Sequence, residues 1–353
     1  MITVLIADDS FLMRKVIGDI LSSDPDIRVV GSVSDGEQVI AEAKRLQPDV
    51  ITMDLEMPKL NGLEATRHLM HGSDSRPIVL MVSAFGRDQA EMMLECLHAG
   101  AFDCVTKPSG PLSLDLEKVK KEMIAKVKAA ASSRRDALKR NRPLREPVQT
   151  VSVRPGSGEC PLVLMGASTG GPPILEEFFA DLVSPLPAAV LVVQHMPEHF
   201  TATMADRIDR ISCMKVKEAQ DGERLKPGLA LVAPGNFHMR VVLEMEDDRQ
   251  IPVVRLSQTE PIHGMRPSID ALMTSASRVY KGPIVGVLLT GMGEDGAEGM
   301  AAIHNCGGTT IVQDPQTCVV DSMVQAALRQ TTVDSIVTPD ELAHGVASAV
   351  SLF

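Results

Sequence analysis

Over roughly the first 131 residues, short apolar runs rich in β-branched residues alternate with amphipathic segments. In the segments between the runs, apolar residues recur at three- and four-residue intervals, which is typical of a helix with one buried face. Five repeats of run and helix predict an α/β domain with a doubly wound parallel sheet. The expected strands are Val4–Ala7, Val29–Val33, Val50–Met53, Ile78–Val82 and Cys104–Thr106.

The apolar periodicity stops between about Ser132 and Ser157, where basic residues and prolines are frequent. We interpret this segment as a solvated linker, with docking to a partner as the other interpretation. A second α/β series then predicts another doubly wound, mainly parallel domain. Its expected strands are Leu162–Met165, Ala189–Val193, Leu229–Val232, Ile284–Leu289 and Thr309–Val312. We therefore expect a first domain over residues 1–125, a linker over 126–158 and a second domain over 159–353.

Composition and charge narrow the class of protein. The hydrophobic content of 44% is that of a globular chain, and the net charge of −11 disfavours binding to nucleic acid or to an anionic membrane. No apolar run approaches the ~18 residues that span a bilayer, and Met1–Ala7 lacks a basic signal-type region. We expect a cytoplasmic protein without membrane insertion. Metal-ligand spacing is absent among its six cysteines, Cys96, Cys104, Cys160, Cys213, Cys306 and Cys318.

Polar residues follow the strands of the first domain. Asp8 and Asp9 follow the first strand, Asp54 the third, Ser83 the fourth and Lys107 the fifth. Carboxyl ends of parallel strands share the ligand-binding edge of a sheet, and a flavodoxin-like strand order would bring the three carboxylates together. Such a cluster repels itself unless it binds a cation, and oxygen ligands suit Mg²⁺. Asp54 is then placed to accept a phosphoryl group.

Lys107 can neutralise phosphoryl oxygens, and the Ser83 hydroxyl can turn to bind the same group, which would make a switch. Taken singly, Asp9 could cap a helix and Lys107 could simply end a strand. Together the motifs resemble the receiver domain of two-component response regulators: Ala7–Ser10, Met53–Pro58, Asn61–Gly62, Ser83–Ala84 and Thr106–Pro108.

The receiver resemblance implies phosphorylation at Asp54 by a histidine kinase and a cis peptide bond before Pro108. It also implies a Mg²⁺ ion held by Asp9, Asp54 and the backbone carbonyl of Glu56, with Asp8 assisting. The output that such a receiver would control has to be inferred from the second domain.

The second domain begins with a strand and a glycine-rich turn, Gly166–Pro172, that exposes Ser168 at the start of a helix. The turn fits the G-x-S-x-G pattern of a nucleophilic serine. A turn of this kind also suits phosphate or dinucleotide binding through backbone N–H groups. This segment alone leaves both interpretations open.

His195 and Asp295 follow the ends of two later expected strands, Ala189–Val193 and Ile284–Leu289, which would gather serine, histidine and aspartate at one sheet edge. His195 could then take the proton of Ser168, Asp295 could orient the imidazole, and backbone donors near Thr169 and Met292 could bind an oxyanion. The order along the chain disfavours a lipase-type fold. The rival residues are His199, His238 and His263 for the base, and Glu294 and Asp270 for the acid, although Asp270 looks more like part of a helix cap.

Motifs spread over about residues 160–350 resemble the chemotaxis protein-glutamate methylesterase family: Ala167–Gly171, Gln194–Pro197, Ala233–Gly235, His263–Asp270, Leu289–Ala297 and Gln313–Asp314. The resemblance implies hydrolysis of glutamate methyl esters on chemoreceptors, often with deamidation of receptor glutamines, and no cofactor for the esterase. It assigns the triad to Ser168, His195 and Asp295. One departure is Asp321–Val324, where the family usually has a Gly-Met-Pro run.

Phosphorylation of the first domain would then control the esterase of the second. Our hypothesis is that the unphosphorylated receiver covers the rim around Ser168 and that phosphorylation of Asp54 releases it. The alternative is a response regulator with a nucleotide-binding output domain. In that case the Ser168 turn would bind phosphate, and His195 and Asp295 would have no evident task.

Overall fold

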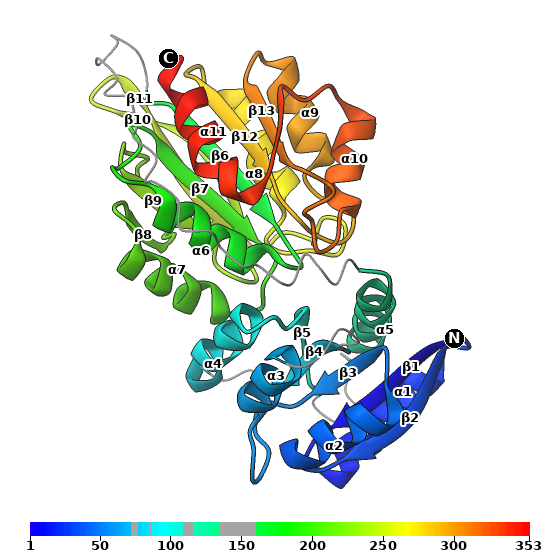
Figure 1. Cartoon of the computed structure of the whole chain (residues 1–353). Coiled ribbons are helices and arrows are strands. Elements are labelled where there is room, and N and C mark those ends of the chain that lie inside the picture. Colours follow the sequence, from blue (N-terminus) through cyan, green and yellow to red (C-terminus); the bar gives the residue numbers. More distant parts are fainter. Residues whose placement is uncertain (72–76, 85–86, 109–115, 134–159) are drawn as a thin grey trace. The chain divides into compact units, whose positions relative to one another are not determined.

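The computed structural model describes residues 1–71, 77–84, 87–108, 116–133 and 160–353, except for the side chains of residues 87 and 88. The chain divides into two compact units, residues 1–140 and 141–353 (Figure 1). The basic part of the expected linker lies outside the described residues. Within the described residues, no helix has the length and apolar character needed to cross a membrane.

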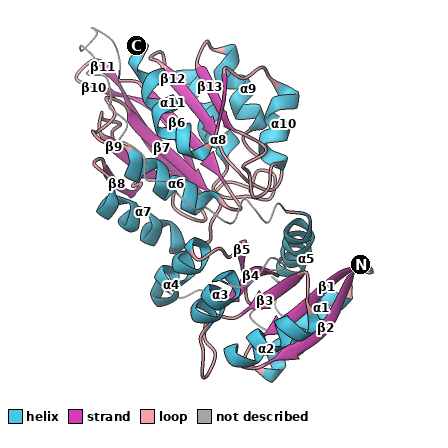
Figure 2. Ribbon diagram, viewed as in Figure 1, coloured by secondary structure: helices cyan, strands magenta, loops and turns pink. Residues whose placement is uncertain are grey.

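The first unit has a five-stranded parallel sheet in the order β2-β1-β3-β4-β5, as the flavodoxin-like prediction required. Its helices lie in two layers, since α1 contacts α5 on one side and α2, α3 and α4 contact in sequence on the other (Figure 2). The strands are β1 (Ile2–Ala7), β2 (Ile27–Val33), β3 (Val50–Met53), β4 (Ile78–Ser83) and β5 (Asp103–Thr106). The helices are α1 (Phe11–Ser22), α2 (Gly36–Leu46), α3 (Gly62–His71), α4 (Arg87–His98) and α5 (Leu116–Ser132).

The last helix of the first unit corrects the expected domain boundary at residue 125. Helix α5 continues to Ser132 because Val127 and Ala130 are buried in the core of this unit. A second expectation is also wrong, since the peptide bond before Pro108 is not cis. Within the described residues, the cis bond precedes Pro267.

The second unit has a seven-stranded parallel sheet in the order β14-β13-β12-β6-β7-β9-β8. Helix α6 contacts α7 and α11 on one face, and α9 contacts α8 and α10 on the other. The strands are β6 (Leu162–Ala167), β7 (Ala189–Gln194), β8 (Lys215–Glu218), β9 (Leu229–Val232), β12 (Ile284–Leu288), β13 (Thr309–Gln313) and β14 (Ser335–Val337). The helices are α6 (Gly171–Asp181), α7 (Phe200–Ile211), α8 (Ile269–Val279), α9 (Ala297–Asn305), α10 (Ser322–Gln330) and α11 (Pro339–Ser351).

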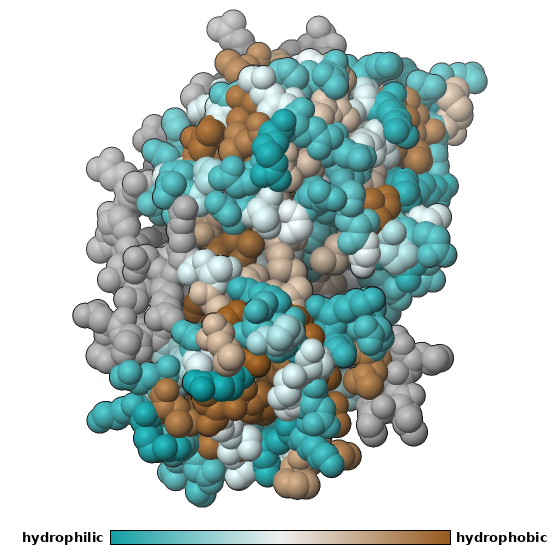
Figure 3. All heavy atoms as spheres, turned by 90° about the vertical axis from the view of Figure 1, so that its right-hand side faces the viewer, coloured by the Kyte–Doolittle hydropathy of each residue, from teal (hydrophilic) through white to brown (hydrophobic). Residues whose placement is uncertain are grey.

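An antiparallel hairpin, β10 (His238–Glu246) and β11 (Arg249–Ser257), adds a part that the sequence did not predict. It packs on α8 through Val241, whose N–H donates to the Ser275 hydroxyl at 3.0 Å. Central strands β6, β7 and β12 are wholly buried, as expected for a sheet covered on both faces. The face of this unit seen in Figure 3 is accordingly mostly hydrophilic, with scattered apolar residues.

Candidate active site and phosphoacceptor site

In the first unit, Asp8, Asp9 and Asp54 meet at the carboxyl ends of β1 and β3. These strands are paired from Val4–Val50 to Ala7–Met53. One carboxylate oxygen from each aspartate lies within 4.8 Å of the other two. Asp8 and Asp54 are buried and Asp9 is exposed, so the cluster opens to solvent on one side. The structure therefore brings together the three carboxylates that the sequence predicted would converge.

Lys107 lies across the buried part of this cluster. Its Nζ is 2.6 Å from an oxygen of Asp54 and 2.8 Å from an oxygen of Asp8. The pKa of Asp54 is nevertheless raised to about 6, chiefly by burial and also by the charge of Asp8, against the opposing effect of Lys107. The single ammonium group of Lys107 thus does not fully offset the effects of burial and of the charge of Asp8 on the pKa of Asp54.

The residues of this cluster fit a magnesium ion. Each of the three aspartates offers a carboxylate oxygen, the type of ligand that Mg²⁺ prefers, and a cation would offset the repulsion between Asp8 and Asp54. A hollow of about 420 Å³, lined by Asp9, Glu56 and Asn61 among others, leaves room for a phosphodonor and for metal-bound water. A bound Mg²⁺ ion would supply charge neutralisation for an incoming phosphoryl group.

Ser83 is engaged with a residue that the sequence did not single out. Its Oγ donates to Oε1 of Gln89 at 2.9 Å, and Nε2 of Gln89 donates to the Glu56 carboxylate at 2.8 Å. Gln89 thus connects the predicted switch hydroxyl to the segment that follows Asp54. Its place on α4, outside the strand-end motifs, gave no sequence signal of this role.

We expect phosphorylation of Asp54 by a small-molecule phosphodonor to slow as the pH falls through about 6 in low Mg²⁺. The reason is that only the ionised carboxylate is nucleophilic. Because a bound cation favours the ionised form, saturating Mg²⁺ should move the midpoint to lower pH. Intact-mass spectrometry of the initial phosphorylation rate measures this midpoint.

In this experiment, Asp9→Asn should diminish the Mg²⁺-dependent displacement, because it removes one carboxylate of the cluster. Asp19→Asn, an exposed change on α1, serves as the matched control and should behave like the unmodified chain. A midpoint that stays in place at saturating Mg²⁺ would contradict metal binding by these carboxylates.

In the second unit, a strand-to-helix turn holds Ser168. The Ser168 N–H donates to the Thr290 carbonyl at 3.0 Å, and its carbonyl accepts from the Gly171 N–H at 2.9 Å. Gly170 has φ = 78° and no room for a side chain, since a Cβ there would lie 2.6 Å from a methyl group of Val319. Gly170 is therefore required for the sharp turn that begins α6.

His195 lies beside Ser168 because β6 and β7 are paired up to Ala167 and Gln194, the residues immediately before them. Nε2 of His195 is 2.8 Å from Oδ2 of Asp295. The other ring nitrogen, Nδ1, is buried and has no protein partner. This nitrogen is thus available to exchange a proton with a group bound at the Ser168 turn.

Asp295 is fixed by four hydrogen bonds. Oδ2 binds His195 and accepts from the Ile269 N–H at 2.7 Å, and Oδ1 accepts from the Ser268 hydroxyl at 2.8 Å and the Asp270 N–H at 3.0 Å. Burial alone would raise the pKa of Asp295, but His195 and these N–H groups outweigh it and lower the pKa to about 2. Asp295 is therefore an ionised partner for His195 at neutral pH.

Gln194 joins the serine and histidine segments. Its Nε2 donates to the Ser168 carbonyl at 2.9 Å and to the His195 carbonyl at 3.2 Å. The side chain is buried, with 2% of its surface exposed. Although Gln194 belongs to a motif noted in the sequence, its role depends on a cross-strand contact that sequence spacing does not reveal.

The predicted oxyanion donors lie on either side of Ser168. Thr169 is the next residue, and its carbonyl accepts from the Thr290 hydroxyl at 3.0 Å. Met292 follows Gly291, which packs so closely that a Cβ there would lie 2.7 Å from Cβ of Ser168. The turns that carry Thr169 and Met292 are therefore both adjacent to Ser168.

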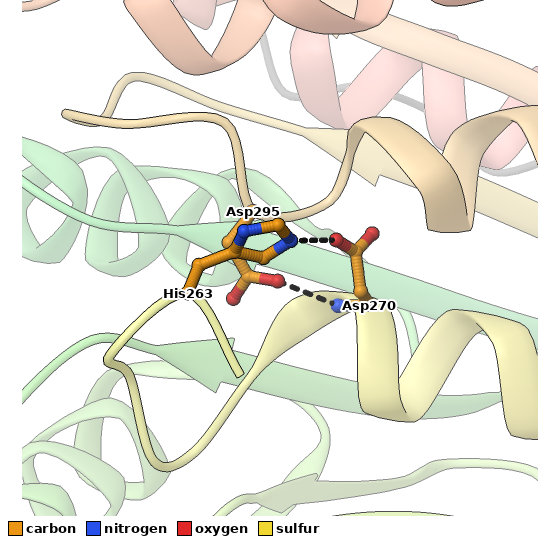
Figure 4. Close-up of side chains that lie close together, drawn as sticks. All are labelled: His263, Asp270 and Asp295. Atoms are coloured by element: carbon orange, nitrogen blue, oxygen red, sulfur yellow. Dashed lines mark hydrogen bonds and ion pairs between the residues drawn. The ribbon is translucent and has the colours of Figure 1, made fainter. Parts of the chain in front are cut away.

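The rival residues occupy other positions. His199 precedes α7, and the buried His238 lies on β10 with Nε2 3.1 Å from the Glu260 carbonyl. Glu294 is exposed, whereas Asp270 is buried in the first turn of α8. The segment from Ser268 to Asp270 caps the start of α8 as expected, with Ser268 as the N-cap residue. His263 and Asp270 lie next to Asp295 (Figure 4).

The unusual Asp321–Val324 segment begins α10 and contacts the active-site turn. The Ser322 hydroxyl donates to the Gly291 carbonyl at 3.2 Å and accepts from the Gly293 N–H at 3.0 Å. A Cβ at Gly291 would lie 2.1 Å from the sulfur of Met323. The segment therefore supports the turn beside Ser168.

Comparison with known proteins identifies both units. The CheB methylesterase model matches residues 163–346, and the response regulator receiver domain model matches residues 4–117. The chain belongs to the CheB methylesterase family. Its Ser168 turn, His195 and Asp295 all fall within the first of these matched regions.

Relatives match the chain over nearly its whole length. A protein-glutamate methylesterase/protein-glutamine glutaminase of Pyrococcus horikoshii is 40% identical over 99% of this chain and 94% of its own length. A protein of the same name from Symbiobacterium thermophilum is 42% identical over 99% of this chain and 97% of its own length. The Thermotoga maritima CheB methylesterase catalytic domain aligns with a TM-score of 0.51 and 35% identity, over 55% of this chain and 100% of that structure.

Proposed function

We propose that this chain is a phosphorylation-activated protein-glutamate methylesterase of chemotaxis adaptation, which releases methanol from glutamate methyl esters of chemoreceptors. The observation that carries the proposal is the pairing of His195 with Asp295 at 2.8 Å beside the Ser168 turn. The full-length similarity to methylesterase/glutaminase proteins supports the substrate class. Deamidation of receptor glutamines by the same site belongs to the proposal.

In the proposed reaction, Nδ1 of His195 takes the proton of Ser168 as Oγ attacks the ester carbonyl. Asp295 stabilises the imidazolium that forms. Backbone N–H groups near Thr169 and Met292 bind the oxyanion of the tetrahedral intermediate. His195 then gives the proton to the departing methoxide oxygen, which leaves as methanol, and water hydrolyses the acyl-serine by the same steps. With a glutamine substrate the leaving group is ammonia.

The first unit supplies the proposed control. Asp54 accepts a phosphoryl group from a chemotaxis histidine kinase, with Asp8, Asp9, Asp54 and the Glu56 carbonyl holding Mg²⁺. Lys107 neutralises the phosphoryl oxygens, and Ser83 turns toward them. The hydroxyl of Ser83 would have to leave Gln89 to do so. We place the protein in the cytoplasm, where the kinase and the receptor helices would meet it.

The test is methanol release from methylated receptor membranes by the full-length chain. We expect a phosphodonor and Mg²⁺ to raise the rate, and we expect Asp54→Asn to abolish this stimulation while the basal rate remains, because an amide cannot accept the phosphoryl group. Asp19→Asn is the surface control. Methanol release that is equal with and without a phosphodonor would overturn the proposed control, and its absence under all conditions would overturn the esterase.

A further inference from the structure

A second imidazole–carboxyl pair lies beside Asp295 and is not used by the proposed reaction. Nε2 of His263 is 3.3 Å from Oδ2 of Asp270, and the Asp270 N–H donates to Asp295. Figure 4 shows the His263 ring directed at the Asp270 carboxylate, with Asp295 adjacent to both. Two aspartates and a histidine thus form one continuous cluster.

The Asp270 side chain is held between two partners. It is 3% exposed, and its Oδ1 accepts from the Gly299 N–H at 2.7 Å. Its Oδ2 is buried and receives no hydrogen bond, and the His263 ring lies 3.3 Å from this oxygen. Burial and the charge of Asp295 together raise the pKa of Asp270 to about 6. An ionised Asp270 without a counter-charge is therefore costly.

A metal ion explains the cluster less well. Each oxygen of Asp295 already accepts two hydrogen bonds, from His195 and Ile269 on one side and from Ser268 and Asp270 on the other. A cation at Asp295 would have to displace these bonds, including the one to His195. The cluster is therefore better explained by charge balance than by metal coordination.

Carboxylates lie near both ring nitrogens of His263. Nδ1 of His263 is 3.5 Å from the exposed carboxylate of Glu294, on the turn before α9. The nearest positive group of its own loop, Arg266, is bound to Asn236 and to the carbonyls of Gln258 and Thr259. His238 from β10 and His195 from the end of β7 also interact with Asp295.

A tight turn presents His263 to Asp270. Ile262 and Met265 exchange backbone hydrogen bonds of 2.8 and 3.1 Å, and His263 and Gly264 between them have φ = 50° and 76°. Arg266 anchors the end of the turn through its bonds to Asn236. The position of the imidazole is thus set by the backbone of the loop and not only by its ion pair.

We propose that His263 is a positioning residue that neutralises Asp270, so that Asp295 alone supplies the negative charge that faces His195. The proposal rests on the proposed function in one respect, the role of His195 as base. Above the pH of about 6 at which Asp270 ionises, the cluster of His263→Gln carries one more negative charge than that of the unmodified chain. The added charge favours the protonated form of His195 and moves the acidic limb of the pH–rate profile to higher pH.

The experiment measures kcat/KM for methanol release against pH, using the full-length chain with Mg²⁺, a phosphodonor and methylated receptor membranes. We expect the acidic limb of His263→Gln to move to higher pH by about half to one unit. Asp270→Asn can keep its bond to Gly299 and should not move it upward. The double variant His263→Gln/Asp270→Asn should return the limb to its original position, because neither residue then carries a charge.

The matched control is His304→Gln, an exposed change in the last turn of α9. The first unit has the same sequence in all variants. Any pH dependence of phosphorylation therefore affects every pH–rate profile equally and does not contribute to the differences between them. If His263 had only a structural role, its substitution would lower the rate without moving the acidic limb of the pH–rate profile. The rate would then be lowest in the double variant. The inference would be overturned if the acidic limb of His263→Gln coincided with that of the unmodified chain. It would also be overturned if the acidic limb of the double variant stayed at higher pH. An inactive unmodified chain would instead refute the proposed function.

Discussion

Methanol release by Ser168→Ala should fall by about 10⁴-fold or more, to the level left by binding and oxyanion stabilisation alone. The substitution removes the Oγ that attacks the ester and that transfers its proton to His195. It leaves the turn in place, since the backbone bonds of Ser168 to Thr290 and Gly171 do not involve the side chain. The rate of methanol release at saturating receptor concentration measures the loss.

A second measurement, the thermal unfolding midpoint, distinguishes a loss of catalysis from a loss of folding. The thermal unfolding midpoint of Ser168→Ala should equal that of variants with exposed substitutions. Alanine is smaller than serine by the hydroxyl alone, so it fits the same space. Ser348→Ala, an exposed change on α11, is the matched control and should retain full activity. If Ser168→Ala retained a few per cent of the activity or more, the nucleophile would have to be another group.

The parallel sheets and their strand-end residues could be predicted from the sequence for a physical reason. A buried parallel strand has a continuous apolar run, and its carboxyl end is marked by the first polar residues after it. Asp54 after β3 and His195 after β7 both follow such runs. The second α/β domain followed from the same pattern, whereas the apolar runs do not determine the flavodoxin-like strand order of the first domain.

The hairpin of β10 and β11 escaped prediction because its pattern is different. Its residues from Glu244 to Arg249 are mostly charged or exposed, and only one face of the ribbon packs on α8. The edge strands β8 and β14 are short and partly exposed, so they too lack a continuous apolar run. Local sequence gave little sign of these strands.

Contacts between side chains that are far apart along the chain could not be predicted from the sequence either. His263 and Asp270 were considered as separate rivals for the triad, whereas the structure pairs them next to Asp295. Gln194 and Gln89 act through hydrogen bonds to residues on other elements. The nucleotide-binding alternative gave His195 and Asp295 no task, and their direct contact beside Ser168 gives them one.

Asp295→Asn should lose activity by about 10⁴-fold and, unlike Ser168→Ala, should also lose stability. An amide oriented toward His195 favours the wrong tautomer of the imidazole. The amide has one acceptor oxygen, but four donors surround this side chain at the start of α8. At least one buried donor then lacks a partner, which costs about 1–3 kcal/mol.

The pH dependence of stability provides an independent check on Asp295→Asn. Because the folded-state pKa of Asp295 is lowered to about 2, its ionisation stabilises the fold above the unfolded value of about 3.9 and loses this effect as the pH falls toward 2. The difference in unfolding free energy between the unmodified chain and Asp295→Asn should therefore narrow over that interval. Denaturant unfolding of the two chains measures this difference.

Glu298→Gln makes the same carboxyl-to-amide change at an exposed position of α9, and it should match the unmodified chain in both activity and stability. The combination of results distinguishes the roles of the two residues. Ser168 provides a reacting atom, so its loss affects the rate alone, whereas Asp295 also ties α8 to the active-site turn. An Asp295→Asn variant with full stability and full activity would show that the contact with His195 neither orients the base nor supports the helix.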